Sequence, residues 1–299
     1  MDTDIIHPFG EHHEWNESFY FSFYDRERDI TAFMRIGLKP NKDEKSLFCF
    51  LMTPDGLIGL RGAEEYGDAS LKVQGVEFQK VEAERQWDLR FHGMMGKLTE
   101  DGMVPIEAEF DLRWESLNDV FDYRSCVSGE KERISQKVAS EHLEQFGKVT
   151  GELRIGDRRF GIDALGERDH SWGIRDWTAP RMWIWLTAQF SDRCALNVTQ
   201  LTVDEGVVDA GFIHLDGGNL PVMKARIDTA YRDNGGPERF EMALTDDSGR
   251  EHRVFAEILR EACMPFHGDG GTSVMYETLA RYEFEGRVGY GIAEYLIRQ

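Results

Sequence analysis

The sequence predicts an all-β protein built from two tandem antiparallel barrel-like domains that are joined by a short helix. Short runs in which apolar and polar residues alternate dominate the chain, and turns rich in Gly, Asp and Asn separate them. The order of strands and turns begins again in the second half of the chain. A length of 299 residues also exceeds the usual size of a single hydrophobic core, which favours two domains.

The first half contains several stretches that are typical of strands. An aromatic alternating run, a turn at residues 25–28 and a second alternating run predict a hairpin, and a Pro-Asp-Gly turn at residues 54–56 follows the third run. The expected strands are residues 19–24, 30–36, 45–52, 78–81, 86–91 and 106–114.

A helix is expected near residues 134–146, because Ile134, Val138, Leu143 and Phe146 recur there at roughly helical spacing. Gly147 follows them and is suited to a helix C-cap. We therefore place the domain junction near residues 140–150, with an N-terminal domain of residues 1–145 and a C-terminal domain of residues 146–299.

The second half repeats the features of the first as a degenerate duplication. An aromatic strand again precedes a turn with Asp and Arg, and a later strand ends at the turn of residues 216–219. Antiparallel meanders with many short strands usually close into barrels, although a single large sandwich is the alternative. The expected strands are residues 183–190, 195–201, 208–214, 226–231, 240–244, 254–259 and 288–297.

Charge and composition exclude several classes of partner. The formal net charge of −20 disfavours nucleic acid and anionic membrane surfaces, since both require clustered Lys and Arg. No apolar run is long enough to insert into a membrane, and the first residues do not have the pattern of a secretory signal. The widely spaced cysteines suit buried, reduced thiols, so we expect a cytoplasmic protein. A homodimer is compatible with the sequence.

The densest group of chemical side chains is residues 166–177, Gly-Glu-Arg-Asp-His-Ser-Trp-Gly-Ile-Arg-Asp-Trp. Asp169 beside His170 would suit proton transfer near neutral pH. Arginine side chains bind anions or carboxylates in a bidentate fork, and tryptophans provide flat apolar walls. This mixture predicts a polar active site in an aromatic pocket, and the alternative is a structural turn with a buried Arg–Asp network. The expected substrate-binding residues are Arg168, Trp172, Arg175, Asp176, Trp177, Trp183 and Trp185.

Three features of the sequence resemble those of a known superfamily. They are the Arg-Asp-His-Ser-Trp-Gly motif, the tandem barrel pattern and the ending Val-Gly-Tyr-Gly-Ile-Ala-Glu-Tyr-Leu-Ile at residues 288–297. Together they resemble the carotenoid 1,2-hydratase-like, tandem lipocalin-like superfamily, including a group of bacterial proteins with this motif. Fungal Diels–Alderases are more remote relatives. The resemblance implies two lipocalin-like domains, no organic cofactor, and an apolar substrate held in a barrel or at the domain junction.

Only some of the functional residues of this superfamily have counterparts in the chain. His170 and Trp172 match the His-x-Trp pair that is proposed to act on the alkene in the carotenoid hydratases. The hydratases also have an acidic residue with a Tyr on the next strand, where this chain has Asn197 and Thr199. Another acid would therefore be needed, and Asp169, Asp176 or Glu294 could supply it.

The strand expected at the C-terminus adds two candidates. Alternation places Tyr290 and Glu294 on one face with apolar neighbours, which would raise the pKa of the carboxyl and suit a general acid. A solvent-facing Glu is the alternative. His7, His12, His13 and Glu14 lack the regular spacing of metal ligands, so we interpret them as a flexible polar arm and expect no tightly bound zinc or iron.

These residues predict an acid–base enzyme that acts on an apolar terpenoid, steroid or polycyclic aromatic substrate without a cofactor. Asp169, His170 and Glu294 are the candidate catalytic residues, in a hydratase or dehydratase, an isomerase or a cyclase. A lipocalin-like carrier or sensor that binds a small apolar molecule without chemistry is the rival hypothesis. A third hypothesis makes the motif a structural lock.

Overall fold

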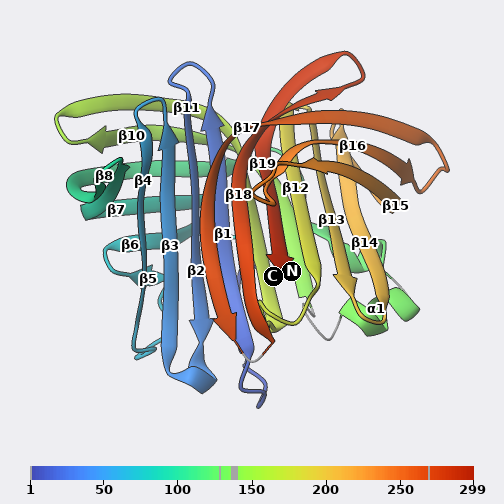
Figure 1. Ribbon diagram of the computed structural model, residues 1–299, viewed down its shortest axis with the longest axis horizontal. Helices are drawn as coiled ribbons and strands as arrows, with labels where there is room; N and C mark the ends of the chain where they lie inside the picture. The colour runs from blue at the N-terminus through green and yellow to red at the C-terminus, as the bar shows by residue number, and fades with distance from the viewer. Residues whose placement is uncertain (1, 128, 136–140, 269) are drawn as a thin grey trace. The chain divides into compact units, whose positions relative to one another are not determined.

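The computed structural model describes residues 2–127, 129–135, 141–268 and 270–299 (Figure 1). Its chain divides into two compact units, which we describe separately. The first unit comprises residues 1–120 and 145–173, and the second comprises residues 121–144 and 174–299. Both units are built almost entirely from antiparallel strands. The predicted all-β class with two antiparallel barrel-like domains is thereby confirmed.

The strands of the first unit form a sheet in the order β4-β3-β2-β1-β11-β10-β8-β7-β6-β5. A short pairing of β4 with β7, at Ile58 with Lys97 and Gly59 with Gly96, closes the part of the sheet from β4 to β7 on itself. The strands are β1 Trp15–Asp25, β2 Ile30–Lys39, β3 Glu44–Thr53, β4 Gly56–Glu64, β5 Lys72–Val73, β6 Val76–Glu82, β7 Gln86–Thr99, β8 Gly102–Ser116, β10 Glu141–Ile155 and β11 Arg158–Ile174, with a 3-10 turn at Pro40–Lys42.

The core of the first unit is aromatic because alternate residues of β1 point to the same side. Phe19, Phe21 and Phe23 are buried on that side. The Phe21 ring contacts Trp87 and Trp114, with centroid distances of 5.6 Å and 6.1 Å. Glu17 lies two residues before Phe19, so a carboxylate continues this apolar row.

The second unit contains a closed barrel of β12 to β19 in sequence order. The sequence-predicted strands of this half all fall within it. The barrel strands are β12 Met182–Ser191, β13 Cys194–Val203, β14 Gly206–Leu215, β15 Gly218–Tyr231, β16 Pro237–Asp246, β17 Glu251–Gly268, β18 Gly271–Phe284 and β19 Arg287–Arg298.

The two faces of β12 have different partners. Ile184, Leu186 and Ala188 belong to the apolar core of the barrel. The alternate residues Trp183 and Trp185 point to the opposite face and are nevertheless buried. The polar groups described below lie on this second face.

The prediction of a helix at residues 134–146 is wrong. A shorter helix, α1, covers Glu130–Ser135, and β10 begins at Glu141, while the intervening residues 136–140 lie outside the described part. The helical spacing of apolar residues was overridden by strand pairing, because Leu143 and Glu144 pair with β9 Phe121–Asp122. A 3-10 turn at Tyr123–Ser125 follows β9.

The two compact units divide the chain differently from the predicted domains, which were separated at residue 145. Both units are discontinuous, since residues 121–144 belong to the second unit and residues 145–173 to the first. The Arg-Asp-His-Ser-Trp-Gly motif at residues 168–173 therefore belongs to the first unit.

Cysteine burial agrees with the sequence-based expectation at three of four positions. Cys49, Cys126 and Cys194 are buried free thiols, whereas Cys263 is an exposed free thiol. In the described part of the chain, no helix has the length and apolar character needed to cross a membrane.

The β16–β17 hairpin should carry an acid-sensitive contribution to stability. Burial raises the pKa of Asp246, but hydrogen bonds from Ser248, His252 and the Arg250 amide outweigh it and bring the pKa to about 2. A carboxyl whose pKa is depressed by folding stabilises the protein above its unfolded pKa, and this contribution is lost as the pH falls from about 4 towards about 2. Asp246→Asn should therefore lower the free energy of unfolding at pH 7, and the difference from wild type should shrink below pH 4.

Urea unfolding at a series of pH values measures this effect. The exposed neighbour Asp247 is the matched control, since Asp247→Asn should leave the free energy of unfolding almost unchanged. A difference between wild type and Asp246→Asn that stays constant down to pH 2 would contradict the prediction.

Candidate functional site

The motif forms the end of β11, so its side chains alternate between two faces of the strand. Arg168, His170 and Trp172 share one face, whereas Asp169 and Ser171 point to the other. The Ser171 hydroxyl lies 3.1 Å from that of Ser18 on this second face. Asp169 is buried but does not face His170 as the sequence interpretation assumed.

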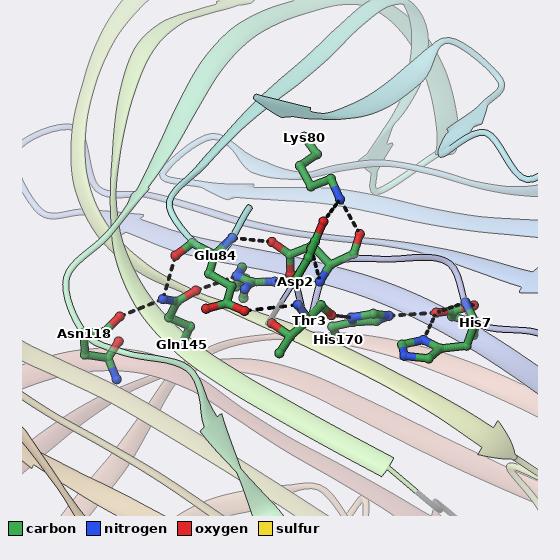
Figure 2. Close-up of polar contacts among 11 residues, drawn as sticks. Asp2, Thr3, His7, Lys80, Glu84, Asn118, Gln145 and His170 are labelled. Atoms are coloured by element: carbon green, nitrogen blue, oxygen red, sulfur yellow. Dashed lines mark hydrogen bonds and ion pairs between the residues drawn. The ribbon is translucent and has the colours of Figure 1, made fainter. Parts of the chain in front are cut away.

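His170 has partners at both ring nitrogens. Its Nδ1 lies 2.9 Å from the Thr3 carbonyl oxygen, and its Nε2 lies 2.9 Å from Glu17 Oε1. The ring stacks on Phe19 with a centroid distance of 4.0 Å. His170 and Glu17 are both fully buried. Figure 2 shows the His170 ring between Thr3 and His7.

His7 approaches the same carboxylate from the N-terminal segment. Its Nδ1 lies 2.8 Å from Glu17 Oε1, and its backbone N–H donates to Glu17 Oε2 over 3.0 Å. The His7 ring stacks on Trp172 at 3.7 Å with an interplanar angle of 11°. The interpretation of His7 as part of a flexible arm is therefore wrong, because specific contacts hold it.

Arg168 forms a buried ion pair. Its guanidinium donates to Asp4 Oδ1 over 2.7 Å and to Gln145 Oε1 over 2.9 Å. It also lies over the Trp114 ring, 5.5 Å from the centroid. Both charged side chains are almost completely buried. These contacts bury the guanidinium among protein groups, and the substrate-binding role expected for Arg168 stays a prediction.

The N-terminal segment is held at further points (Figure 2). Lys80 donates to Asp2 Oδ2 and to the Asp4 carbonyl, each over 2.9 Å. The hydrogen bond from Lys80 lowers the pKa of the Asp2 carboxyl, against a smaller effect of burial. The Glu84 amide donates to Asp4 Oδ2 over 2.7 Å, and the Thr3 amide donates to Glu84 Oε1 over 3.1 Å. Residues 2–7 are thus fixed by hydrogen bonds to the strands of the first unit.

The buried carboxylate of Glu144 lies on the side of β12 to which Trp183 and Trp185 point. Glu144 Oε1 accepts a hydrogen bond of 2.7 Å from the Trp185 indole and lies 2.7 Å from His142 Nε2. The Tyr123 hydroxyl lies 3.3 Å from the same oxygen and 2.5 Å from Asn197 Oδ1. The His142 and Tyr123 rings stack at 4.6 Å. We call these five residues the Glu144 cluster.

The segment that carries the Glu144 cluster is fixed to the barrel. Phe121 stacks on Phe212 at 4.4 Å. Cys126 Sγ accepts from the Gly211 amide over 3.5 Å, and burial raises the pKa of this thiol despite that bond. Because Glu144 pairs in register with Phe121, these contacts also help to hold Glu144 on the barrel wall.

An aromatic group with one arginine lies beside this cluster. The Arg175 guanidinium lies over Trp177 and Trp183, at 5.3 Å and 4.9 Å from the ring centroids. Trp177 stacks on Phe266 at 5.2 Å, and the Trp183 ring lies 6.5 Å from that of His142. Arg175, Trp177 and Trp183 are thus brought together, whereas Trp185 contacts Glu144. Their role in substrate binding stays a prediction.

The remaining predicted residues have separate positions. Glu294 is buried in β19 and pairs in register with Trp185 of β12 and with Glu277 of β18. Tyr290 is half-buried and lies four residues further back along the same strand. Asp176 accepts hydrogen bonds from the Thr178 amide and hydroxyl, so it stabilises a loop.

Sequence reasoning missed Asp4, Glu17, Tyr123, His142 and Glu144. The His-x-Glu spacing of residues 142 and 144 was a usable signal, because such side chains share one face of a strand. In the expected helix the two would have pointed in different directions, so the helix hid the pair. Asp4 and Glu17 had no local signal for their pairing with the motif, since Arg168 and His170 lie more than 150 positions away from them in the sequence.

A cavity of about 510 Å³ lies in the second unit, away from the Glu144 cluster. It is partly open to solvent, and apolar side chains such as Ile184, Ile227 and Phe240 line it together with polar and charged ones, namely Gln200, Asp228, Thr229, Arg239 and Glu241. A cavity of this volume is within the range of small-molecule sites.

Comparison with known proteins places this geometry in context. The sequence matches no curated protein. Among solved structures, a putative AttH from Nitrosomonas europaea has a TM-score of 0.63 at 11% identity, covering 94% of this chain and 92% of that one. CghA with Sch210972 has a TM-score of 0.63 at 10% identity, covering 100% and 94%. Kievitone hydratase from Nectria haematococca has a TM-score of 0.63 at 12% identity, covering 94% and 88%.

These structures share the fold of this chain. The sequence itself gives a more direct assignment, because one family matches it from residue 1 to residue 299. On that match the chain belongs to the family described as "Domain of unknown function (DUF7064)".

Proposed function

We propose that the protein is an acid–base enzyme that acts on an apolar substrate without an organic cofactor. The reaction would be a hydration, dehydration, isomerisation or cyclisation of a terpenoid, steroid or polycyclic aromatic compound. Glu144 and His142 would transfer the proton. Trp177, Trp183 and Arg175 would bind the substrate.

The observation that carries the proposal is the convergence of groups on Glu144 Oε1. A buried carboxylate oxygen that lies 2.7 Å from an imidazole nitrogen is a pair of groups suited to acid–base catalysis. The Trp185 indole and the Tyr123 hydroxyl fix the position of that oxygen. Fixed donors around a reactive group in a water-poor site are typical of acid–base catalysis.

The neighbouring aromatic rings suit an apolar substrate in which positive charge develops. The faces of tryptophan rings attract cations, and Trp183 already lies beneath the Arg175 guanidinium at 4.9 Å. The same guanidinium could bind a carbonyl or carboxylate group of the substrate. Glu294, which pairs in register with Trp185, is a second candidate acid on this face.

The proposal moves the catalytic role away from His170. Both nitrogens of His170 are engaged with Thr3 and Glu17, and Asp169 lies on the opposite face of the strand. The names of the solved relatives support an enzyme, since one is a hydratase and another was solved with a small molecule.

A carrier of an apolar ligand is the second candidate, and the cavity of about 510 Å³ favours it. Its lining combines apolar side chains with polar and charged groups, so the ligand of a carrier would need a polar end as well as an apolar body. A carrier would bind its ligand in this cavity and release it unchanged.

Solvent deuterium distinguishes the two candidates. The protein would be incubated in D₂O with a panel of terpenoid, steroid and polycyclic aromatic alkenes and alcohols, followed by mass spectrometry. We expect at least one compound to gain deuterium at carbon, because a proton delivered through His142 and Glu144 originates from solvent. Binding without a change in mass would support the carrier, and neither binding nor exchange across the panel would contradict both.

A further inference from the structure

We propose that His7, Glu17 and His170 form a binding site for a divalent first-row transition-metal ion in the first unit. The three side chains come from the N-terminal segment, β1 and β11, and their ligand atoms all lie within 4.8 Å of one another. Two imidazoles and one carboxylate are a ligand set that binds zinc and iron in many proteins. This inference is independent of the Glu144 cluster, which lies in the second unit.

The distances suit coordination of a single ion. Glu17 Oε1 lies 2.8 Å from His7 Nδ1 and 2.9 Å from His170 Nε2. Two ligands that each lie about 2.1 Å from an ion, at a right angle to each other, are separated by about 3.0 Å. A tetrahedral angle would separate them by about 3.4 Å. Both spacings from Glu17 Oε1 are nearer to the right-angle value, which favours an octahedral arrangement with coordination positions left for water or a ligand.

The position of the proton on the His170 ring also favours a cation between His170 and Glu17. The Thr3 carbonyl can only accept, so His170 Nδ1 carries the proton in that 2.9 Å hydrogen bond. In the neutral ring the Nε2 lone pair then points at Glu17 Oε1, which is itself an acceptor. A proton on Nε2 or a metal ion between these atoms resolves the conflict. Metal-bound histidines characteristically donate their other N–H to a backbone carbonyl, as His170 does.

The three ligand side chains are already held in position in the absence of an ion. The His170 ring stacks on Phe19 and the His7 ring stacks on Trp172, which limits the rotation of both imidazoles. The His7 backbone amide donates to the Glu17 carboxylate and orients it. The Glu17 and His170 side chains are fully buried, whereas the His7 side chain is 20% exposed, so an ion would enter beside His7.

The chemistry of the ligands selects the class of ion. Imidazole nitrogens suit Zn²⁺, Fe²⁺, Co²⁺ and Ni²⁺, whereas Mg²⁺ and Ca²⁺ prefer oxygen ligands throughout. The inference departs from the sequence-based expectation of no bound zinc or iron. That expectation relied on regular spacing along the chain, and here the ligands are separated by 10 and 153 residues.

Cobalt provides the most informative probe. The full-length protein would be treated with a chelator, dialysed and titrated with Co²⁺ while the visible absorption spectrum is recorded. We expect one equivalent to bind with a weak spectrum typical of five or six ligands, and Zn²⁺ to displace it. Bound metal should raise the melting temperature, since a ligand that binds the folded state stabilises it. Mg²⁺ should have no such effect.

Two variants test the ligands. His7→Ala should weaken Co²⁺ binding by about 100-fold or more and remove the metal-dependent rise in melting temperature, because it deletes a ligand outright. His7 is partly exposed, so this variant should still fold. His12 is the matched control, an exposed histidine in the same segment, and His12→Ala should bind Co²⁺ like wild type.

Two results would overturn the inference. One is wild-type protein that binds far less than one equivalent of Co²⁺ after chelator treatment. The other is His7→Ala protein whose affinity for Co²⁺ equals that of wild type. Glu17→Gln provides a further check, because it removes the charge of the carboxylate while its shape is retained, and it should also weaken binding.

Discussion

Replacing Glu144 by glutamine is expected to lower the rate of the proposed reaction by about 10²–10⁴-fold, while the affinity for the substrate changes little. Glutamine has the shape of glutamate but cannot take up or release the proton. The Trp185 indole would retain an amide oxygen as its acceptor at this position, so the fold should be preserved. Single-turnover kinetics with ligand binding measured in parallel would separate the rate from the affinity.

The control for this prediction is Glu238→Gln, which changes an exposed glutamate in the same unit. It should leave both rate and affinity unchanged. A Glu144→Gln protein that retains the wild-type rate would remove Glu144 from the mechanism. A loss of affinity equal to the loss of catalytic efficiency would assign Glu144 to substrate binding instead.

Replacing Arg168 by methionine should destabilise the first unit by about 3–5 kcal/mol. Methionine fills much of the same volume but leaves the Asp4 carboxylate buried without its guanidinium partner, and breaking a buried ion pair has this effect. The change also removes the 2.9 Å hydrogen bond to Gln145 and the contact with Trp114. Urea unfolding at pH 7 measures the free energy.

Asp4→Asn combined with Arg168→Met should recover part of the loss, because no unpaired charge then remains. Arg159 lies on the same strand with a side chain that is 72% exposed, and Arg159→Met should change the stability by less than about 0.5 kcal/mol. If Arg168→Met were as mild as this control, a stabilising role for Arg168 would be wrong. The substrate-binding role that the sequence predicted would then be preferred.

The fold class could be predicted because strand signals are local. In β1 and β12, alternate residues are apolar or aromatic, and a period of two follows directly from the geometry of an extended chain. The same local pattern could not distinguish a helix from a strand at residues 134–146. The apolar residues there also suit a strand, and the pairing of Leu143 with Asp122 decided between the two.

The candidate site could be predicted only in part, since a motif reveals the residues but not their partners. Trp177 and Trp183 lie against Arg175, and these residues are close enough in sequence for a local motif to suggest the contact. The partner of Arg168 is 164 positions away, and that of His170 is 153 positions away. Such contacts depend on how β1 and β11 pair, and no local pattern encodes that pairing.

The discontinuity of the two units has a consequence for synthesis on the ribosome. In the sheet of the first unit, β11 and β10 stand between β1 and β8, although they follow both in the sequence. A nascent chain that has emerged only as far as residue 120 therefore has an open sheet with unpaired edges at β1 and β8. Residues 121–144 emerge next, before the barrel of their own unit has been made. The first barrel can close only after Ile174, the last residue of β11, has left the exit tunnel, so its folding is delayed well beyond the translation of its N-terminal half.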